Sequence, residues 1–428
     1  MIEEFSFENF NSFKELNTLN MTAAKIKSRY SRLDTDNVTV VNDVSLLKSK
    51  GIYGANASGK SNVVKALGCF IKIVQFSVKD DQTLKKYVTP FFLSTETVNK
   101  PVFFQLIFRH EGVRYRYGFE ADREQIQGEW LYSTPGKREQ PLFVRDKGSL
   151  TKINKIHFPE GETFMKLTNN DEENSIFRKN SLFLTSLAAF GVGKVSKMLV
   201  NQISRILVID GLKQRGAFEH TTAALELPGM KHLVVEFLKM ADLGISELDT
   251  IDYPLENVAD NNKMDKVKIV VTKKDVYDVN LKKITTVPFP LDVYESEGTN
   301  KMYEISTYII NALRQGRTLV IDEFDARFHP LITQKIVEMF NSPGNKEGQL
   351  IFVTHDTNLL SADLLRRDQI DFVEKDAFGA SHLYTLVQFK GIRDTDSFEN
   401  NYIKGKYGAI PYVGGMNKLF SHFKDAEA

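Results

Sequence analysis

Residues 54–61 read Gly-Ala-Asn-Ala-Ser-Gly-Lys-Ser and fit the pattern GxxxxGK[ST]. A short apolar segment precedes them, and apolar residues at helical spacing follow, which predicts a strand, a Gly-rich turn and a helix. Glycines let the N–H groups of such a turn point at a phosphate, and the helix N-terminus adds positive charge. We expect Lys60 to reach the outer phosphates and Ser61 to bind Mg²⁺. The alternative, a plain turn before a helix, is disfavoured by this strand–turn–helix context.

Residues 318–323, TLVIDE, supply a second part of the same hypothesis. An apolar strand that ends in Asp322 places a carboxylate at the edge of the sheet, beside the Gly-rich turn, where it can hold Mg²⁺ opposite Ser61. Glu323 is then positioned to act as a general base on a water molecule. Acidic residues often end strands, so this motif alone is weak evidence for a Mg²⁺ site. The Gly-rich loop in the same chain makes it stronger.

Two further segments extend the candidate site. The apolar strand 349–355 ends in His355, whose imidazole can contact an outer phosphate, although a surface histidine at a strand end is the commoner case. Ser296 is a good N-cap for a helix predicted over 300–314, and with Gly298 it forms an anion-binding helix start. Simple helix capping explains Ser296 equally well.

Composition is that of an ordinary globular chain. The 428 residues carry a formal net charge of +1 and are 42% hydrophobic, which suits a large core in two or three lobes and gives no overall field that attracts nucleic acid. A single cysteine, Cys69, excludes an internal disulfide framework, and eight histidines make a zinc site improbable. No signal peptide and no apolar run of ~20 residues is evident, so we expect a cytoplasmic protein without membrane contact.

The order of patterns predicts an α/β protein in three parts. Alternating aromatic segments over 101–145 indicate antiparallel hairpins, and apolar strands with amphipathic helices after Tyr303 indicate a parallel sheet. We therefore divide the chain into residues 1–145, a helical and β insert over 146–285, and residues 286–428. Other expectations are a loop over 168–175, a helix over 228–242, a hairpin that turns near Lys273–Lys274, and a helix over 357–367. Sustained heptads are lacking, which argues against a long coiled coil.

The motifs together resemble those of the ABC ATPase class, in its SMC- and RecF-like branch. The phrases EFSFENFNSFKE, GANASGKSN, ESEGTNKMYE, LVIDEFDARFHP and FVTHDTNLL are similar to stand-alone prokaryotic ATPases of the RloA and AbiL type, relatives of the ATPase half of OLD proteins. The resemblance covers roughly 1–130 and 285–415. It implies an ABC-type ATPase head, an antiparallel β lobe plus a parallel P-loop core, with an insert in place of the SMC coiled coil.

That resemblance also implies roles for individual residues. Lys60, Glu323 and His355 are the expected catalytic groups, and Ser61 and Asp322 the expected Mg²⁺ ligands. The residues expected to bind ATP are Gly54, Asn56, Ser58, Gly59, Lys60, Ser61 and Asn62, together with the signature residues Ser296 and Gly298. Residues 326–329 match the D-loop. Two departures from the family pattern are the signature SEGT and a histidine, His329, in place of the usual D-loop aspartate. Four glutamines are open candidates for the Q-loop: Gln82, Gln105, Gln125 and Gln127.

The resemblance further implies a switch that hydrolyses ATP and is completed by a second copy. Ser296 would face ATP held by the other subunit of a homodimer or a higher even oligomer. A separately encoded effector, a nuclease or toxin in anti-phage defence, is the expected partner. The alternative is a RecF- or SMC-like protein of DNA repair that grips DNA through basic clusters, for which Lys25–Arg32 and Lys263–Lys274 are candidates, although solvated faces explain them equally well. A transporter subunit is disfavoured by the motif wording.

Overall fold

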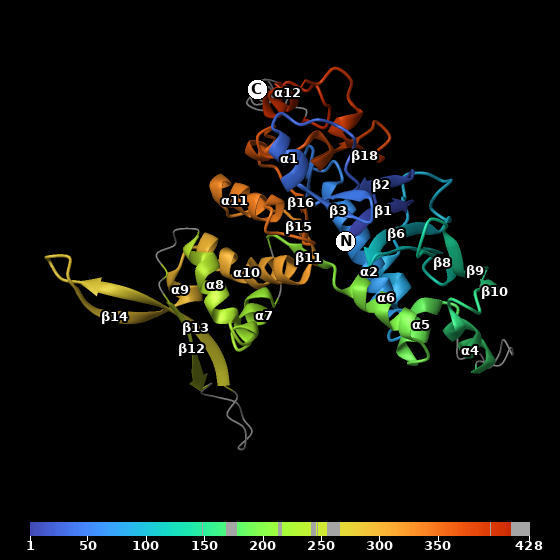
Figure 1. Ribbon diagram of the computed structural model, residues 1–428, viewed down its shortest axis with the longest axis horizontal. Coiled ribbons are helices and arrows are strands. Elements are labelled where there is room, and N and C mark those ends of the chain that lie inside the picture. Colours follow the sequence, from blue (N-terminus) through green and yellow to red (C-terminus); the bar gives the residue numbers. More distant parts are fainter. Residues whose placement is uncertain are drawn as a thin grey trace, which may run out of the picture.

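The computed structural model describes residues 1–147, 149–167, 178–212, 216–240, 245, 247–254, 266–393 and 395–411. The predicted loop over 168–175 and the residues 263–265 of the second basic cluster lie outside these ranges. The helix predicted over 228–242 is present as α8 (Met230–Lys239). Figure 1 shows the molecule as a main body with two lobes and an arm of strands that projects from one side.

A six-stranded sheet forms the centre of the body. Five of its strands run parallel and are covered on both faces, as the sequence predicts for its apolar runs. The last strand, β18, pairs antiparallel with β17 at one edge. In spatial order the strands are β11 (Leu207–Asp210), β15 (Thr318–Asp322), β16 (Gln349–Val353), β5 (Ser49–Tyr53), β17 (Ile370–Lys375) and β18 (Ser381–Thr385).

A seven-stranded antiparallel sheet forms the second lobe, and its hairpins confirm the prediction for 101–145. Its strands, in spatial order, are β10 (Ser149–Ile153), β9 (Gln140–Asp146), β8 (Ile126–Thr134), β7 (Val113–Ala121), β6 (Val102–His110), β1 (Ile2–Glu8) and β2 (Asn17–Asn20). A separate two-stranded ribbon pairs β3 (Val38–Val41) with β4 (Val44–Leu47).

The helix α2 (Lys60–Phe76) lies between these two sheets and shares one hydrophobic core with both. Val63, Leu67 and Phe70 pack in this core against residues of β1, β6 and β7 on one side. Val320 and Ile351 reach the same core from the central sheet, whereas their neighbours in sequence point to the opposite face, as the two-residue period of a strand requires. The first turn of α2 is therefore fixed at the end of β5.

The opposite face of the central sheet is covered by α10 (Glu297–Gln315) and α11 (Pro330–Asn341), and α8 packs against α10. Short helices complete the body, and they are α1 (Ser31–Asp36), α3 (Thr83–Tyr87), α4 (Pro159–Leu167), α5 (Phe183–Ala189), α6 (Lys194–Ser204), α7 (Ala217–Ala224), α9 (Leu291–Tyr294) and α12 (Phe398–Ile403). The predicted fold class, an antiparallel lobe and a parallel α/β core with a helical and β insert, is confirmed.

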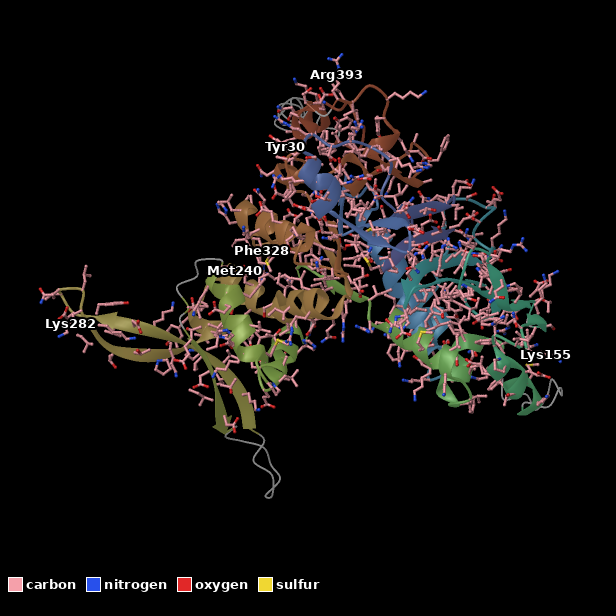
Figure 2. The ribbon with its side chains drawn as sticks, viewed as in Figure 1. Tyr30, Lys155, Met240, Lys282, Phe328 and Arg393 are labelled. Atoms are coloured by element: carbon pink, nitrogen blue, oxygen red, sulfur yellow. The ribbon has the colours of Figure 1, made fainter. Side chains whose placement is uncertain are left out.

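The projecting arm consists of β12 (Glu247–Pro254), β13 (Lys266–Tyr277) and β14 (Lys283–Pro290). Lys282 lies at the far end of this arm, away from the body (Figure 2). The prediction of a turn near Lys273–Lys274 is wrong, because β13 continues through both residues to Tyr277. The turn is made instead at Asp278, whose Oδ1 accepts hydrogen bonds from the backbone of Asn280 and Lys282.

The helix predicted over 357–367 is also wrong. This segment contains the single 3-10 turn Thr357–Leu359 and one hydrogen-bonded turn over 361–365 before a second 3-10 turn, Arg367–Gln369. Asp356 caps the first turn by accepting from Asn358 N at 3.0 Å, a local bond that competes with helix propagation. Apolar residues at helical spacing here pack as a buried connection between β16 and β17.

The domain limits stay predictions, but one element crosses them. The strand β11 lies within the range 146–285 and pairs in parallel with β15, so the residues of the expected insert contribute to the central sheet. Among the described residues no single helix is long and apolar enough to cross a membrane. The pair α5 and α6 reaches that length and composition only together, with a bend of 107° between them.

Candidate functional site

The loop between β5 and α2 has a backbone that only small residues allow. Gly59 has φ 111°, and a Cβ on it would lie 2.4 Å from Ser381 Oγ and 2.7 Å from Ser12 Oγ. A Cβ on Gly54 would lie 2.4 Å from the carbonyl oxygen of Val373. Both positions of the pattern thus require glycine, because neighbouring atoms lie too close for any side chain. The loop is held between β17, β18 and the N-terminal lobe.

Lys60 is the first residue of α2 and is buried, with 5% of its surface exposed. Its Nζ donates to the carbonyl oxygens of Gly54 and Ala55, both at 2.8 Å, so the ammonium lies across the loop. Burial lowers the pKa of Lys60 to about 8, against the opposing effect of Glu323 and Asp322. The loop therefore concentrates one poorly solvated positive charge where the sequence predicts a phosphate.

Ser61 and Asp322 meet, as their predicted joint role as Mg²⁺ ligands requires. Ser61 Oγ donates to Asp322 Oδ1 at 3.1 Å, although 261 residues separate them in the chain. Burial raises the pKa of Asp322, while the bonds from Ser61 and from the Glu323 backbone lower it. No cluster of three or more His, Cys, Asp or Glu side chains suited to a metal occurs in the described ranges. The metal ligands offered are one hydroxyl and one carboxylate.

A cavity of about 830 Å³ opens over the loop. Glu323 and His355 line it together with Asn56, Ser58 and Lys60. Glu323 adopts φ 50°, a left-handed conformation in which its side chain leaves the strand direction of β15. The predicted phosphate-binding residues from Asn56 to Ser61 and the predicted base thus face one space. Ser58 is buried, and its Oγ has no hydrogen-bond partner among the residues that the structure describes.

Three residues of this region were missed by the sequence predictions. Asp325 Oδ1 accepts from Thr354 Oγ1 at 2.6 Å and from His355 N at 3.1 Å, which ties the turn after β15 to the end of β16. Lys375 ends β17 and lines the cavity as an exposed cation. Thr354 directly precedes His355, and Asp325 lies two residues after Glu323, so nearness to these predicted residues was the only signal in the sequence.

Two predicted members of the site lie elsewhere around the loop. Asn62 does not line the cavity; its Nδ2 donates to Ser12 Oγ at 2.8 Å and so ties α2 to the N-terminal lobe. Gly54 borders a neighbouring cavity of about 420 Å³, which shares Asn56 and His355 with the first. None of the four candidate Q-loop glutamines lines either cavity.

Ser296 and Gly298 are absent from the cavity that holds Lys60 and Glu323. Ser296 caps α10, where its Oγ accepts from Thr299 N at 3.2 Å, as the sequence predicts. A Cβ on Gly298 would lie 3.0 Å from the carbonyl oxygen of Arg327, in the predicted D-loop. Arg327 adopts φ 67°. The start of α10 therefore packs against the turn that follows Glu323, while Ser296 itself is exposed.

A further cavity of about 650 Å³ lies between α1 and α11. Two of its charged residues, Lys335 and Glu338, pair with each other at 3.1 Å. It has no glycine-rich backbone turn and no part of the motifs, so the chemistry points to the cavity over the loop.

Comparison with known proteins gives one family match. A family model described as "AAA domain, putative AbiEii toxin, Type IV TA system" matches residues 51–361. A search of curated proteins finds no match. Among solved structures the chain is similar to the SMC head domain from Thermotoga maritima, with 13% identity over 90% of this chain and 98% of that chain and a TM-score of 0.40. It is also similar to SmcHead bound to the C-winged helix domain of ScpA, with 14% identity, coverage of 90% and 97%, and a TM-score of 0.41.

Proposed function

The chain belongs to the AAA-domain family whose model it matches, and on this premise we propose that it is an ATP-hydrolysing switch that two copies complete. One observation carries the proposal: a single cavity gathers the Gly-rich loop, Glu323 and His355, beside the contact between Ser61 and Asp322. ATP binding would bring two copies together, and hydrolysis would release them.

The phosphates of ATP fit the loop by charge and by hydrogen bonding. The N-cap position of α2 is Gly59, which has no side chain to satisfy the N–H groups of the first turn. Ser58 Oγ is buried beside them without a partner among the described residues. Lys60 can exchange its two carbonyl acceptors for phosphate oxygens. An anion here would therefore satisfy several donors at once.

Mg²⁺ fits the same place. Oxygen ligands are those it prefers, and it keeps several waters, so one hydroxyl and one carboxylate suffice when the phosphates supply the rest. Ser61 and Asp322 already lie within hydrogen-bond distance of each other. The ion, when bound, neutralises charge on the phosphate oxygens.

Hydrolysis requires a base near the terminal phosphate. In the proposed reaction Glu323 accepts a proton from water as the water oxygen bonds to the γ-phosphorus and the bond to the β–γ bridging oxygen breaks, which gives ADP and phosphate. His355, just after the neighbouring strand β16, would hydrogen-bond a phosphate oxygen. Asp325 fixes the backbone of His355 and so sets its position relative to Glu323.

We propose that a second copy of the chain supplies the signature turn, which does not line this cavity. Ser296 and Glu297 are exposed at the N-terminus of α10, and the flanking residues Val293 and Tyr294 are exposed apolar side chains. In the head-to-tail arrangement implied by the ABC-type motifs, this turn would contact the γ-phosphate of ATP on the other copy. The apolar pair beside it offers surface for the contact between copies.

For the output of the switch we propose a separately encoded toxic effector in anti-phage defence. The motif resemblance to RloA- and AbiL-type ATPases supports this, and the description of the matched family also names a putative toxin of a type IV TA system. DNA binding is the rival. In the described part of the second basic cluster, Lys268, Lys273 and Lys274 each pair with a glutamate, which reduces the charge available to DNA.

The core of the proposal is tested with Glu323→Gln. We expect ATP hydrolysis to fall by about 100-fold or more, because the base is lost, while ATP binding persists and a closed dimer accumulates. The measurements are phosphate release and light scattering with and without ATP. Lys60→Ala should abolish ATP binding and the dimer together. Glu236→Gln, an exposed residue of α8 paired with Lys239, is the matched control. Normal hydrolysis by Glu323→Gln would refute the base assignment.

The output is tested by co-expression with the product of the adjacent gene. A toxic neighbour whose activity depends on Glu323 supports the defence proposal. ATP- and salt-dependent binding of duplex DNA, together with a repair gene as neighbour, would instead favour the rival function.

A further inference from the structure

Lys301 is a buried cation in the second turn of α10, five residues after Ser296 in the chain. Only 3% of its side chain is exposed. No hydrogen-bond acceptor for its Nζ occurs within the part of the chain that the structure describes. The nearest carboxylate oxygen is Glu304 Oε2 at 3.8 Å, which is beyond hydrogen-bond distance.

Packing alone does not explain a lysine at this position. A buried ammonium without hydrogen bonds destabilises the folded state, and an unbranched apolar side chain of similar length would fill the same space. Burial accordingly lowers the pKa of Lys301 despite the opposing effect of Glu304 and Asp210. Buried polar groups left unsatisfied are typical of places where function, rather than stability, sets the residue.

The surroundings of Lys301 join three parts of the proposed machinery. Arg327, in the predicted D-loop, lowers the pKa of Lys301 and forms an ion pair with Glu297 at 3.4 Å. Its carbonyl oxygen contacts the position of Gly298. The first turns of α10, which carry Lys301, therefore contact the predicted D-loop through Glu297 and Gly298.

Lys301 is also connected to the proposed base, Glu323, through residues at the end of β11. The charge of Asp210 acts to raise the pKa of Lys301, and Asp210 is paired in register with Asp322 across β11 and β15. The next residue, Gly211, donates its N–H to the carbonyl oxygen of Asp322 at 2.7 Å. A Cβ on Gly211 would lie 2.1 Å from the carbonyl oxygen of Glu323. The end of β11 thus packs directly on the backbone that carries the proposed base.

We propose that Lys301 is a positioning residue that couples closure of the second copy on the α10 turn to the placement of Glu323. This inference rests on the proposed function. Contact of the other copy with Ser296 shifts the first turns of α10, and the ammonium of Lys301 then pairs with Asp210. That ion pair fixes the end of β11, and through Gly211 it fixes the turn that bears Glu323. Lys301 touches no reacting atom.

The test compares Lys301→Met with the wild type in three measurements: ATP binding, thermal unfolding without nucleotide, and hydrolysis. We expect ATP affinity to change by less than about threefold and hydrolysis to fall by about tenfold or more, because the coupling acts only after binding. The melting temperature should not fall, because the substitution removes an unsatisfied buried charge. Lys301→Arg, which keeps the charge, should recover part of the hydrolysis. Lys239→Met, an exposed lysine of α8, is the matched control.

The outcomes separate this inference from the proposed function. If the wild type neither associates with ATP nor hydrolyses it, both proposals are overturned. If the wild type does both and Lys301→Met hydrolyses ATP at the wild-type rate, only the coupling is overturned. A fall in melting temperature that matches the fall in hydrolysis, without rescue by Lys301→Arg, would make the role purely structural and also overturn the coupling. Should Lys301→Met fail to fold, Asp210→Asn must show the same split between binding and hydrolysis.

Discussion

Two helix N-termini of this chain are made of small residues, and they differ in how their donors are satisfied. At α2 the N-cap is Gly59, no side chain caps the first turn, and a buried lysine lies across the loop. At α10 the N-cap Ser296 bonds to Thr299 N, and the turn is exposed. The first helix start has uncapped backbone N–H groups and a positive charge that suit an anion. At the second, the Ser296 side chain already accepts a hydrogen bond from one of the backbone N–H groups.

This difference indicates that the two helix starts have different roles in the proposed ATP cycle. An uncapped, charged helix start can bind a polyphosphate within one chain. A capped, exposed turn without a lysine in its first turn offers only weak anion binding, and Ser296 must exchange Thr299 N for a phosphate oxygen when it acts. The second turn therefore contributes only when another copy presents an anion already held elsewhere.

A large effect is expected from introducing a negative charge at the second turn. Aspartate and asparagine are both good N-caps, so Ser296→Asp and Ser296→Asn should leave α10 intact. The aspartate would repel a γ-phosphate on the other copy, and we expect hydrolysis to fall by about 30-fold or more with ATP binding unchanged. Phosphate release and light scattering measure the two effects, and Ser296→Asn should lose much less activity.

Mixing variants shows whether the site is shared. Ser296→Asp retains its own loop, and Lys60→Ala retains its own α10 turn, so one intact composite site can form between them. Hydrolysis should reappear when the two inactive proteins are combined. Full activity of Ser296→Asp alone would mean that one chain contains the complete site and would remove the distinction between the two helix starts.

A smaller effect is expected from pH at the first turn. Because the pKa of Lys60 is lowered to about 8, the free protein loses this charge as the pH rises through 8, and phosphate binding must then restore the proton. ATP affinity should therefore decrease as the pH rises, by up to about fivefold between pH 8 and 9. Titration calorimetry across this pH range measures the ATP affinity. Lys60→Arg, which stays protonated, should bind with a flatter pH profile.

The motif-bearing elements could be predicted because their signals are local. An apolar run ending in Asp322 and a glycine-rich turn before α2 each predict one strand or helix end, and parallel strands place those ends at one edge of the sheet. The contact between Ser61 and Asp322 follows from this rule. The capping role of Ser296 is likewise local.

Other features depend on tertiary context that a single sequence does not contain. The segment 357–367 has helical spacing, yet burial between β16 and β17 and the cap at Asp356 prevent a helix. The strand β11 joins the central sheet from within the expected insert, and its four residues do not indicate which strand it pairs with. Lys301 reads as one more surface lysine until its burial is known. Lys375, at the end of β17, carries no motif at all.

Lys375 gives the smallest predicted effect and the sharpest contrast with Lys60. Both cations line the cavity over the loop, but Lys60 is buried and Lys375 is exposed to solvent. Solvent screens an exposed charge, so Lys375→Ala should weaken ATP binding by only about threefold, whereas Lys60→Ala should abolish it. Titration at low and at high salt measures this, and the effect of Lys375 should diminish with added salt. Lys197→Ala, an exposed lysine of α6 outside the cavity, should leave affinity unchanged. A loss of affinity for Lys375→Ala as large as that for Lys60→Ala would mean that the phosphates are bound from the β17 side rather than by the N-terminus of α2.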